Sequence, residues 1–429
     1  MSPVDHETAE SWYEASRDYT IEASRLEGEN TADVAVIGGG LTGAATALCL
    51  AEKGVDVALL ESRHFGWGAS GRSGGQIIAG YSCDQRVLEK LVGTDIAREL
   101  WDHSLAALDF TRERIRKHDI RCDVSRGYLH AAIGVRQARE LEEWAGHLER
   151  NYDYSVLEVH RDAALRTLIE SPVYSMVVSD PGSGHLHPLN YTLGLVEAAS
   201  AAGARLYESA HVVSANKQGS GFLLELDQAR LRCEQVVYAC NAYLNGLQPQ
   251  LQRTIMPVGT CIIATEPLGK RVAAGLIAGG AAVSDASVVL DYYRLAADTR
   301  LLFGGRVSYS SPEPKRLRSA LEKRMLRVFP QLAGTRVEYA WGGYVAVTRN
   351  RAPHIGQCEN GELFAQGFSG QGMSLSGYAG SLLAEAVLGD KSRISSFNSI
   401  PHKAFPGGIR FRKPGLMAAL TYHRLKDWL

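Results

Sequence analysis

The sequence predicts an α/β protein in which a Rossmann-like dinucleotide-binding domain is combined with an α+β domain built on an antiparallel sheet. Residues 33–61 have the pattern of strand, helix and strand around a glycine-rich turn. Residues 253–340 change to successive short strands followed by one helix. A chain of 429 residues is also longer than one hydrophobic core usually serves, so we expect two or three folded units.

The first element is a strand–helix–strand unit that contains a G-x-G-x-x-G motif. Val34–Ile37 is a continuous apolar run, as in a strand buried on both faces, and a helix rich in alanine and leucine follows it. Gly38 allows a tight turn, Gly40 leaves room for a diphosphate, and Gly43 allows close packing of helix on strand. Glu61 ends the second strand, where a carboxylate can accept hydrogen bonds from an adenosine ribose. The motif predicts a dinucleotide site without deciding between NAD and FAD.

A glycine-rich loop, GWGASGRSGGQ at residues 66–76, follows the second strand. A simple NAD enzyme continues from this strand towards another helix and needs no such loop. Bare backbone amides can surround phosphate oxygens, and Ser70, Arg72 and Ser73 add donors. We therefore expect the loop to contact the diphosphate and flavin ring of FAD; the alternative is a mobile surface loop.

A further glycine cluster, GFSGQGM at residues 367–373, lies late in the chain between a strand and a helix that begins near Met373. Free N–H groups and the dipole at a helix start stabilise an anion. This is the environment needed where negative charge develops on a reduced flavin. The alternative is an ordinary turn between strand and helix.

These motifs resemble those of the FAD-dependent amine and amino-acid oxidoreductases related to D-amino-acid oxidase and sarcosine oxidase. The resemblance covers nearly the whole chain, through SWYEAS, GWGASGRSGGQ, GHLHPLN, CNAYL, MPVGT, LDYYRLAADTRLLFGGR and PHKAFPGG. Two positions differ from the family pattern: Ser73 replaces an asparagine, and Gln371 replaces a histidine. The resemblance also implies that the strand holding Val212 passes the adenine and that the chain returns to the cofactor at Asn241.

The resemblance implies a discontinuous FAD-binding domain and a substrate-binding domain whose sheet covers the flavin. The expected FAD-binding domain comprises residues 31–93, 155–252 and 341–395, the substrate-binding domain residues 94–154 and 253–340, and the terminal extensions residues 1–30 and 396–429. Within the first domain, we expect residues 163–215 to add another β-α-β step to the nucleotide-binding sheet.

The candidate site residues follow from these motifs. The expected cofactor contacts are Gly38, Gly40, Leu41, Thr42, Gly43, Glu61, Ser62, Gly68, Ala69, Ser70, Arg72, Ser73, Gly74, Gly75, Gln76, Val212, Asn241, Gly343, Gly367, Gly370, Gln371, Gly372 and Met373. The expected substrate-facing residues are Gln76, Trp341, Tyr344 and Tyr293. For Trp341 the alternative is a buried structural tryptophan, and for Tyr293 an ordinary aromatic residue of a sheet.

The sequence favours an amine as the substrate. Its one G-x-G-x-x-G motif provides no second nucleotide domain for NAD(P)H, so electrons enter from a small molecule and leave to oxygen or another acceptor. Many amino-acid oxidases of the family carry a carboxylate-binding arginine where this chain has Val345. Arg294, Arg306 or Arg349 remains an alternative partner for a carboxylate. The resemblance implies a mono-amide of a diamine, such as gamma-glutamylputrescine, with an amino acid or a secondary amine as the alternative.

The resemblance also bears on how the flavin is held. The cysteine that links flavin covalently in sarcosine oxidases would fall near Gly342 or Gly343, so we expect FAD to be bound non-covalently.

Composition and cysteine spacing exclude several other classes of protein. The net charge is −1, which gives no basic surface for nucleic acid, and no apolar stretch reaches the length of a membrane span. The seven cysteines form no C-x-x-C pair, and we expect a cytoplasmic protein without a metal site. His185 and His187 have no third ligand at a suitable spacing.

Two alternatives and the oligomeric state stay open. One alternative is a flavin-stabilised binding protein without turnover. The other is a quinone-linked dehydrogenase attached to a membrane surface by LMAALTYHRLKDWL near the C-terminus.

Overall fold

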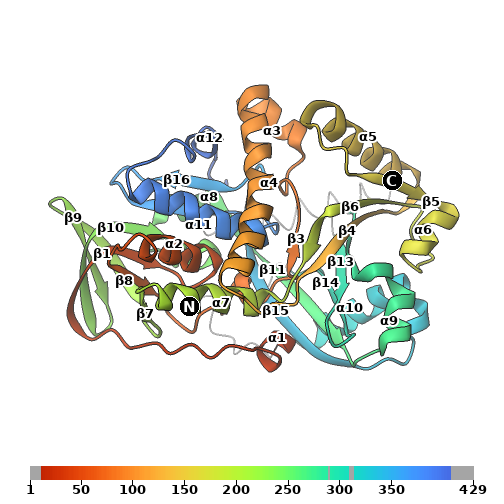
Figure 1. The fold of residues 1–429 in the computed structure, drawn as a ribbon, viewed down its shortest axis with the longest axis horizontal. Helices are drawn as coiled ribbons and strands as arrows, with labels where there is room; N and C mark the ends of the chain where they lie inside the picture. Colours follow the sequence, from red (N-terminus) through yellow and green to blue (C-terminus); the bar gives the residue numbers. More distant parts are fainter. Residues whose placement is uncertain (1–10, 288–289, 309–313, 407–429) are drawn as a thin grey trace.

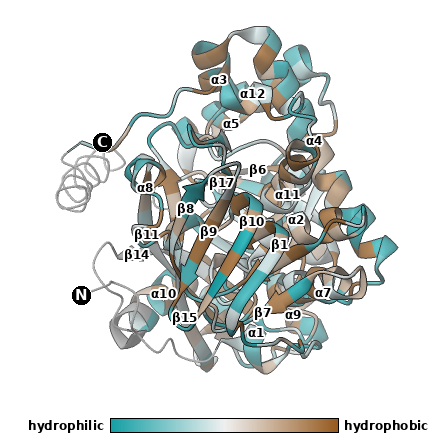
Figure 2. Cartoon of the chain, turned by 90° about the vertical axis from the view of Figure 1, so that its left-hand side faces the viewer, coloured by the Kyte–Doolittle hydropathy of each residue, from teal (hydrophilic) through white to brown (hydrophobic). Residues whose placement is uncertain are grey.

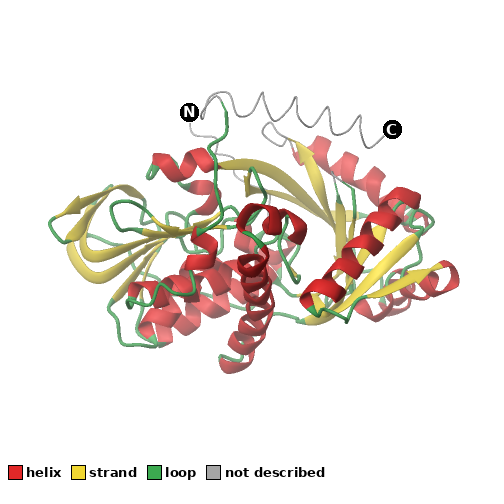
Figure 3. Ribbon diagram, turned by 90° about the horizontal axis from the view of Figure 1, so that it is seen from above, coloured by secondary structure: helices red, strands yellow, loops and turns green. Residues whose placement is uncertain are grey.

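The computed structural model describes residues 11–287, 290–308 and 314–406. In these residues the strands form two sheets, which lie at opposite ends of the molecule with helices between them (Figure 1, Figure 3). The predicted α/β class is confirmed. No helix in the described ranges is long and apolar enough to cross a membrane.

The first sheet has eight strands, in the order β16–β17–β10–β1–β2–β7, with β9 pairing beside β10 and β8 beside β9. Strands β17, β10, β1, β2 and β7 are parallel, whereas β16, β9 and β8 pair antiparallel with their neighbours. The strands are β1 (Gly28–Ile37), β2 (Val57–Leu60), β7 (Arg205–Tyr207), β8 (Val212–Gln218), β9 (Gly221–Leu226), β10 (Ala229–Tyr238), β16 (His354–Gln357) and β17 (Leu363–Gln366).

Both faces of the central part of this sheet are buried, which explains the apolar run of β1. Val34 and Val36 pack with helices α2 (Leu41–Ala51), α7 (Pro188–Ala201) and α11 (Met373–Val387). Ala35 and Ile37 point to the other face, towards β8 and β9, because successive side chains of a strand alternate. The first half of β10 alternates between buried and exposed residues, as the hydropathy colours of Figure 2 also indicate.

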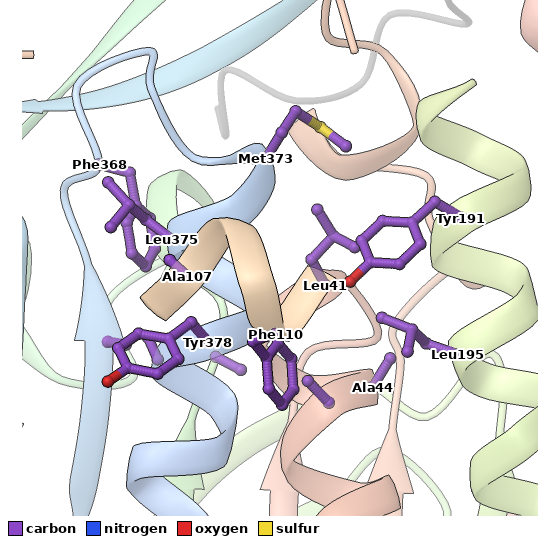
Figure 4. Packing of buried hydrophobic residues seen from close by; sticks show 14 of the residues in the cluster. Leu41, Ala44, Ala107, Phe110, Tyr191, Leu195, Phe368, Met373, Leu375 and Tyr378 are labelled. Carbon is purple, nitrogen blue, oxygen red and sulfur yellow. The ribbon is translucent and has the colours of Figure 1, made fainter. Parts of the chain in front are cut away.

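The helices on the first face share one core. In Figure 4, side chains of α2, α7 and α11 meet those of α4 (Thr94–Lys117), the long helix that stands between the two sheets in Figure 1. The remaining helices are α1 (Trp12–Ala15), α3 (Gln85–Val92), α5 (Gly134–Tyr152), α6 (Asp162–Leu168), α8 (Pro249–Thr254), α9 (Lys270–Leu276), α10 (Pro314–Val328) and α12 (Ser395–Asn398).

The second sheet has nine strands, in the order β15–β11–β14–β13–β12–β4–β6–β3, with β5 pairing beside β6. Most of its pairs are antiparallel, and α10 packs on one of its faces against a separate hydrophobic core. The strands are β3 (Gln76–Ile77), β4 (Ser125–Ala132), β5 (Glu158–Arg161), β6 (Met176–His185), β11 (Ile255–Thr265), β12 (Ala282–Asp285), β13 (Asp291–Leu295), β14 (Leu301–Ser308) and β15 (Val337–Thr348).

Strand β6 corrects one expectation about the first sheet. The segment was expected to add a β-α-β step to the nucleotide-binding sheet, but β6 pairs with β3, β4 and β5 in the second sheet. Strand β15 also lies wholly in the second sheet, although the expected domain boundary divides it at residue 341. The apolar pattern of a strand reports burial and not the sheet that it joins. The domain boundaries themselves stay predictions.

Candidate active site

An elongated crevice opens where β1, β2 and β10 end. Its larger part has a volume of about 590 Å³ and includes the turn after β1, the end of β2 and the turn after β10. A smaller part of about 80 Å³ extends to the start of α11. The residues that line both parts are Gly40, Ala69, Ser70, Ala239 and Asn241. Ligands of parallel α/β sheets bind at this edge, beyond the carboxyl ends of the strands.

The G-x-G-x-x-G turn forms one wall of the crevice with bare backbone. Gly38 has a φ of +112°, and a Cβ there would lie 2.8 Å from the carbonyl oxygen of Ala239. A Cβ at Gly43 would lie 1.9 Å from the carbonyl oxygen of Gly38, so α2 approaches the turn only because position 43 lacks a side chain. A Cβ at Gly40 would lie 2.8 Å from Ser70 Oγ. Gly38 and Gly43 therefore require glycine because a Cβ would meet backbone atoms, whereas at Gly40 the Ser70 side chain would have to move.

Glu61 lies at the end of β2 and lines the larger part of the crevice. Its Oε2 accepts a hydrogen bond of 2.8 Å from the Gly39 N–H, and its Oε1 accepts one of 2.9 Å from the Arg63 N–H. Burial raises the pKa of this carboxyl group above its usual value, and the backbone donors oppose the shift. Two backbone N–H groups thus fix the position of the Glu61 carboxylate, a hydrogen-bond acceptor, where the motif predicts contact with a ribose.

The loop of residues 66–76 carries a partly buried cation, Arg72, beside the crevice. Arg72 Nε donates to the carbonyl oxygen of Trp67 at 2.8 Å, and the Arg72 guanidinium lies 5.5 Å from the centre of the Trp67 ring. Arg72 Nη1 is buried without a hydrogen-bond partner among the described residues. Burial lowers the pKa of Arg72. A buried N–H group without a partner is costly, so this position favours a ligand that supplies an oxygen.

The same loop is hydrogen-bonded to the second sheet. Trp341 Nε1 donates to the Arg72 carbonyl oxygen at 3.0 Å, and Arg294 Nε donates to the Gly74 carbonyl oxygen at 2.7 Å. Gln76 Nε2 donates to the carbonyl oxygen of residue 283 at 3.2 Å. These bonds hold the loop in place, in contrast to the alternative of a mobile surface loop.

The late glycine cluster meets this loop at the start of α11. Ser73 Oγ donates to Met373 Sδ at 2.9 Å, and Met373 is the first residue of the helix. Asn241 has a φ of +46°, and its Oδ1 accepts a hydrogen bond of 3.0 Å from the Gly367 N–H. Gln371 Nε2 donates to the carbonyl oxygen of residue 79 at 3.1 Å. The free N–H groups of the α11 terminus thus lie at one end of the crevice.

Most of the expected cofactor contacts line the crevice. These are Gly38, Gly40, Leu41, Thr42, Glu61, Ser62, Gly68, Ala69, Ser70, Ser73, Val212, Asn241, Gly370, Gly372 and Met373. The expected contacts outside its lining are Gly43, Arg72, Gly74, Gly75, Gln76, Gly343, Gly367 and Gln371. Lining residues that were not among the expected cofactor contacts include Gly39, Trp67, Ala239, Tyr243 and Val345. Gly39 and Trp67 lie inside recognised motifs, but no sequence signal singles out Tyr243.

The placement of Tyr293 as a substrate-facing residue is wrong. Tyr293 is 1% exposed, its hydroxyl donates to Tyr174 Oη at 2.8 Å, and its ring stacks on Phe303 in the core beneath α10. Because strand residues alternate, Tyr292 points to the opposite face, where a Cβ at Gly74 would lie 2.9 Å from its ring. Tyr292 is therefore the tyrosine of this pair that reaches the glycine-rich loop.

The other substrate candidates have different surroundings. Trp341 is 1% exposed, so it supports the loop as a buried structural residue and does not present an open wall. Tyr344 is partly buried on the opposite face of β15, with its ring 6.4 Å from that of Tyr243. Gln76 is partly buried at the start of β3, where the loop enters the second sheet.

The arginines considered as carboxylate partners are placed as follows. Arg294 is buried and donates to neighbouring oxygens, which makes it part of the loop support. Arg349 Nη1 lies 3.4 Å from the carbonyl oxygen of residue 404 on the surface. The side chain of Arg306 and the C-terminal segment of residues 416–429 lie outside the described part of the structure.

Comparison with known proteins identifies the family. The model of the FAD dependent oxidoreductase family, DAO, matches residues 33–386, and the chain belongs to this family. It is therefore an FAD-dependent oxidoreductase.

Two curated relatives are similar over almost their whole length. Gamma-glutamylputrescine oxidoreductase of Escherichia coli is 37% identical over 424 residues, which are 99% of each chain. A probable oxidoreductase, OrdL, of Haemophilus influenzae is 38% identical over 425 residues, or 98% of each chain. Among solved structures, glycine oxidase from Geobacillus kaustophilus matches with a TM-score of 0.73 and 21% identity, over 87% of this chain and all of that one. This last likeness shows the common fold.

The crevice has the features that FAD requires. Its larger part, with Glu61 and Val212, would hold the adenosine, and the bare turn at Gly40 would hold the diphosphate. The start of α11 at Gly372 and Met373 lines the smaller part, where its N–H groups can donate to the oxygens of such a ligand. Arg72, whose Nη1 has no hydrogen-bond partner among the described residues, lies in the adjoining loop outside the lining.

Proposed function

We propose that the protein is an amine oxidase that acts on the free primary amine of gamma-glutamylputrescine or of a closely related mono-amide of a diamine. The observation that carries the proposal is the 37% identity, over 99% of both chains, with an enzyme named for that substrate. Val345 lines the crevice. It gives further support, because many amino-acid oxidases of the family are expected to carry an arginine at this position. An apolar side chain there offers no partner for a carboxylate next to the reacting carbon.

Bound FAD would accept a hydride from the carbon that bears the amine. The resulting imine then reacts with water to give an aldehyde and ammonia. With oxygen as the acceptor, each turnover consumes one O₂ and one H₂O and releases one H₂O₂. The task of the protein is to orient the amine and to stabilise negative charge on the cofactor. We assign the second task to the N–H groups at the start of α11.

We further propose that Tyr292 and Gln76 face the substrate. Tyr292 lies against Gly74 on the face of the second sheet that carries the loop supports, and Gln76 ends the same loop. An aromatic ring and an amide would provide an apolar wall and a hydrogen-bonding group for an extended amide substrate. Because binding energy from the remote glutamyl group can be used to align the reacting carbon, free putrescine should lose turnover as well as affinity.

The decisive experiment measures peroxide release by the purified protein with gamma-glutamylputrescine, putrescine, sarcosine, D-alanine and glycine. The proposal expects the highest kcat/KM for gamma-glutamylputrescine. A preference for D-alanine or glycine would contradict it in favour of an amino-acid oxidase, and a preference for sarcosine would indicate secondary amines. If gamma-glutamylputrescine bleaches the flavin anaerobically but no peroxide forms in air, the substrate assignment stands and the electron acceptor is not oxygen. If no amine bleaches the flavin, the protein is a flavin-stabilised binding protein without turnover.

We also propose that FAD is bound non-covalently in a cytoplasmic protein. Gly342 and Gly343 supply no thiol for a flavin link, and the seven cysteines are all free, as in a reducing compartment. Acid precipitation should therefore release all of the flavin into the supernatant. Flavin that stays with the precipitate would contradict non-covalent binding.

A further inference from the structure

Arg294 is a buried cation whose partners are neutral. It is 3% exposed, in β13, and its Nε donates to the Gly74 carbonyl oxygen at 2.7 Å. Its Nη1 donates to the Leu295 carbonyl oxygen at 3.2 Å, and its Nη2 donates to Tyr13 Oη at 3.2 Å. These acceptors are two carbonyl groups and a phenol. A full positive charge is thus held beside the glycine-rich loop without neutralisation by the groups that bind it.

Tyr13 connects this cation to the second support of the loop. It belongs to the short helix α1, is fully buried, and packs its ring at 5.2 Å and 70° against Trp341. Trp341 holds the Arg72 carbonyl oxygen, while Arg294 holds that of Gly74. The N-terminal segment therefore contacts both Arg294 and Trp341, the two side chains that hydrogen-bond to carbonyl groups of the loop.

The charge of Arg294 acts on the neighbouring titratable groups. Burial lowers the pKa of His185 and of His187 to about 3, and the Arg294 charge contributes to both shifts. Burial raises the pKa of Tyr13 and of Asp123, and in both cases Arg294 opposes the shift. Because the lowered pKa values keep His185 and His187 neutral, Arg294 is the positively charged residue among these neighbouring groups.

We propose that Arg294 is a positioning residue for the FAD site that Tyr13 supports, with two separable effects. Its hydrogen bond fixes the Gly74 carbonyl and so the shape of the cofactor loop. Its buried charge favours the cofactor state that carries more negative charge, because a cation in a low-dielectric interior is weakly screened. Residues 11–16 are then a functional part of the FAD site. The proposal is independent of which amine is oxidised.

Four variants separate these effects: Arg294→Gln, Arg294→Lys, Tyr13→Phe and the control Tyr293→Phe. Tyr293 is adjacent to Arg294 in the sequence, and its side chain lies on the opposite face of the sheet. The control variant removes the buried hydrogen bond between Tyr293 and Tyr174. For each protein, the FAD dissociation constant is measured by titrating apoprotein, the midpoint potential of bound FAD by dye-coupled reduction, and the stability of the apoprotein by thermal unfolding.

Arg294→Gln should raise the FAD dissociation constant about tenfold or more and lower the midpoint potential. Arg294→Lys should weaken binding but keep the potential close to that of the parent, because it keeps the charge. Tyr13→Phe should weaken binding by a smaller factor. Tyr293→Phe should lower the unfolding temperature and leave both FAD properties unchanged.

The proposal is overturned if Arg294→Gln behaves like Tyr293→Phe, with parental affinity and potential but reduced stability. A changed affinity with an unchanged potential would overturn the electrostatic effect and keep the positioning effect. If Arg294→Gln does not fold, the comparison of Arg294→Lys and Tyr13→Phe with the control decides the positioning effect in the same way.

Discussion

The indole N–H of Trp341 donates a 3.0 Å hydrogen bond to the carbonyl oxygen of Arg72. Trp341 lies in β15 of the second sheet, whereas Arg72 lies in the loop that follows β2 of the first. The same loop continues into β3, an edge strand of the second sheet. At the cofactor loop the two sheets are thus connected in two ways: covalently, because the loop runs from β2 into β3, and by the hydrogen bond from the Trp341 side chain.

Trp341→Phe tests this connection. The ring that packs on Tyr13 is largely kept, but the Arg72 carbonyl loses its donor. We expect the FAD dissociation constant to rise by about 5- to 10-fold, since one net hydrogen bond is worth about 1 kcal/mol. Trp101→Phe is a matched control, because Trp101 is equally buried and its Nε1 has no hydrogen-bond partner among the described residues. Equal loss of affinity in both variants would contradict the prediction.

Gly40 is the position where a side chain should interfere most directly with FAD. An added Cβ would lie 2.8 Å from Ser70 Oγ, which accepts the Leu41 N–H at 2.9 Å. We expect Gly40→Ala to weaken FAD binding at least tenfold and Gly40→Val to purify without flavin, which absorbance at 450 nm measures. Gly275→Ala is the control, because Gly275 lies in a helix and a Cβ there would meet no heavy atom within 4 Å apart from the adjacent backbone of its own helix. Full flavin content in Gly40→Val would show that the assigned site is wrong.

Glu61→Gln should separate cofactor binding from stability. Burial raises the pKa of Glu61, so the ionised carboxylate is disfavoured by the fold, and the stability associated with its protonated form is lost as the pH rises through the raised pKa. At pH 7 the apoprotein of Glu61→Gln is relieved of a buried charge, but one of the two backbone N–H groups, Gly39 or Arg63, loses its acceptor, so its unfolding temperature should fall only slightly. Its FAD affinity should nevertheless fall about tenfold, because an amide is a weaker acceptor than a carboxylate. A large loss of apoprotein stability at pH 7 would contradict this separation.

Local patterns were sufficient to predict the nucleotide-binding unit. The positions of Gly38, Gly40, Gly43 and Glu61 follow from steric and hydrogen-bonding needs that are local in the sequence. Helix α11 likewise begins at Met373, near which the sequence predicts a helix start, because a glycine turn before a helical segment is a local signal.

Pairing between distant segments was not predictable in the same way. The sequence does not predict that β6 joins the second sheet, because a buried strand has a similar composition in either sheet. The choice between Tyr292 and Tyr293 depended on which face of β13 meets α10. Nor did the sequence reveal that Arg294, a candidate carboxylate partner, is engaged by the Gly74 carbonyl. Each of these facts depends on long-range contacts.

A pair of partly buried histidines near the end of the described chain makes the stability of the protein depend on pH. The rings of His354 and His402 stack at 4.0 Å, and His354 Nδ1 lies 3.1 Å from Thr254 Oγ1. Burial lowers the pKa of His354 to about 3, with a further contribution from His402, and burial lowers that of His402 to about 4. Both folded-state values lie below the ordinary value of 6.5, so the fold favours the neutral rings.

The stability that these histidines contribute is therefore present above pH 6.5 and is lost as the pH falls towards 4 and 3. The limiting slope is about 1.4 kcal/mol per pH unit for each histidine. We expect urea unfolding of the parent to show a steep fall in the free energy of unfolding between pH 6.5 and pH 4.5. His402→Gln should lower the stability at pH 7, because it disturbs the stack, but should reduce the slope by about 1 kcal/mol per pH unit. Parallel pH profiles for parent and variant would show that His402 titrates in the folded protein as it does in the unfolded chain, and that the stack does not hold it neutral.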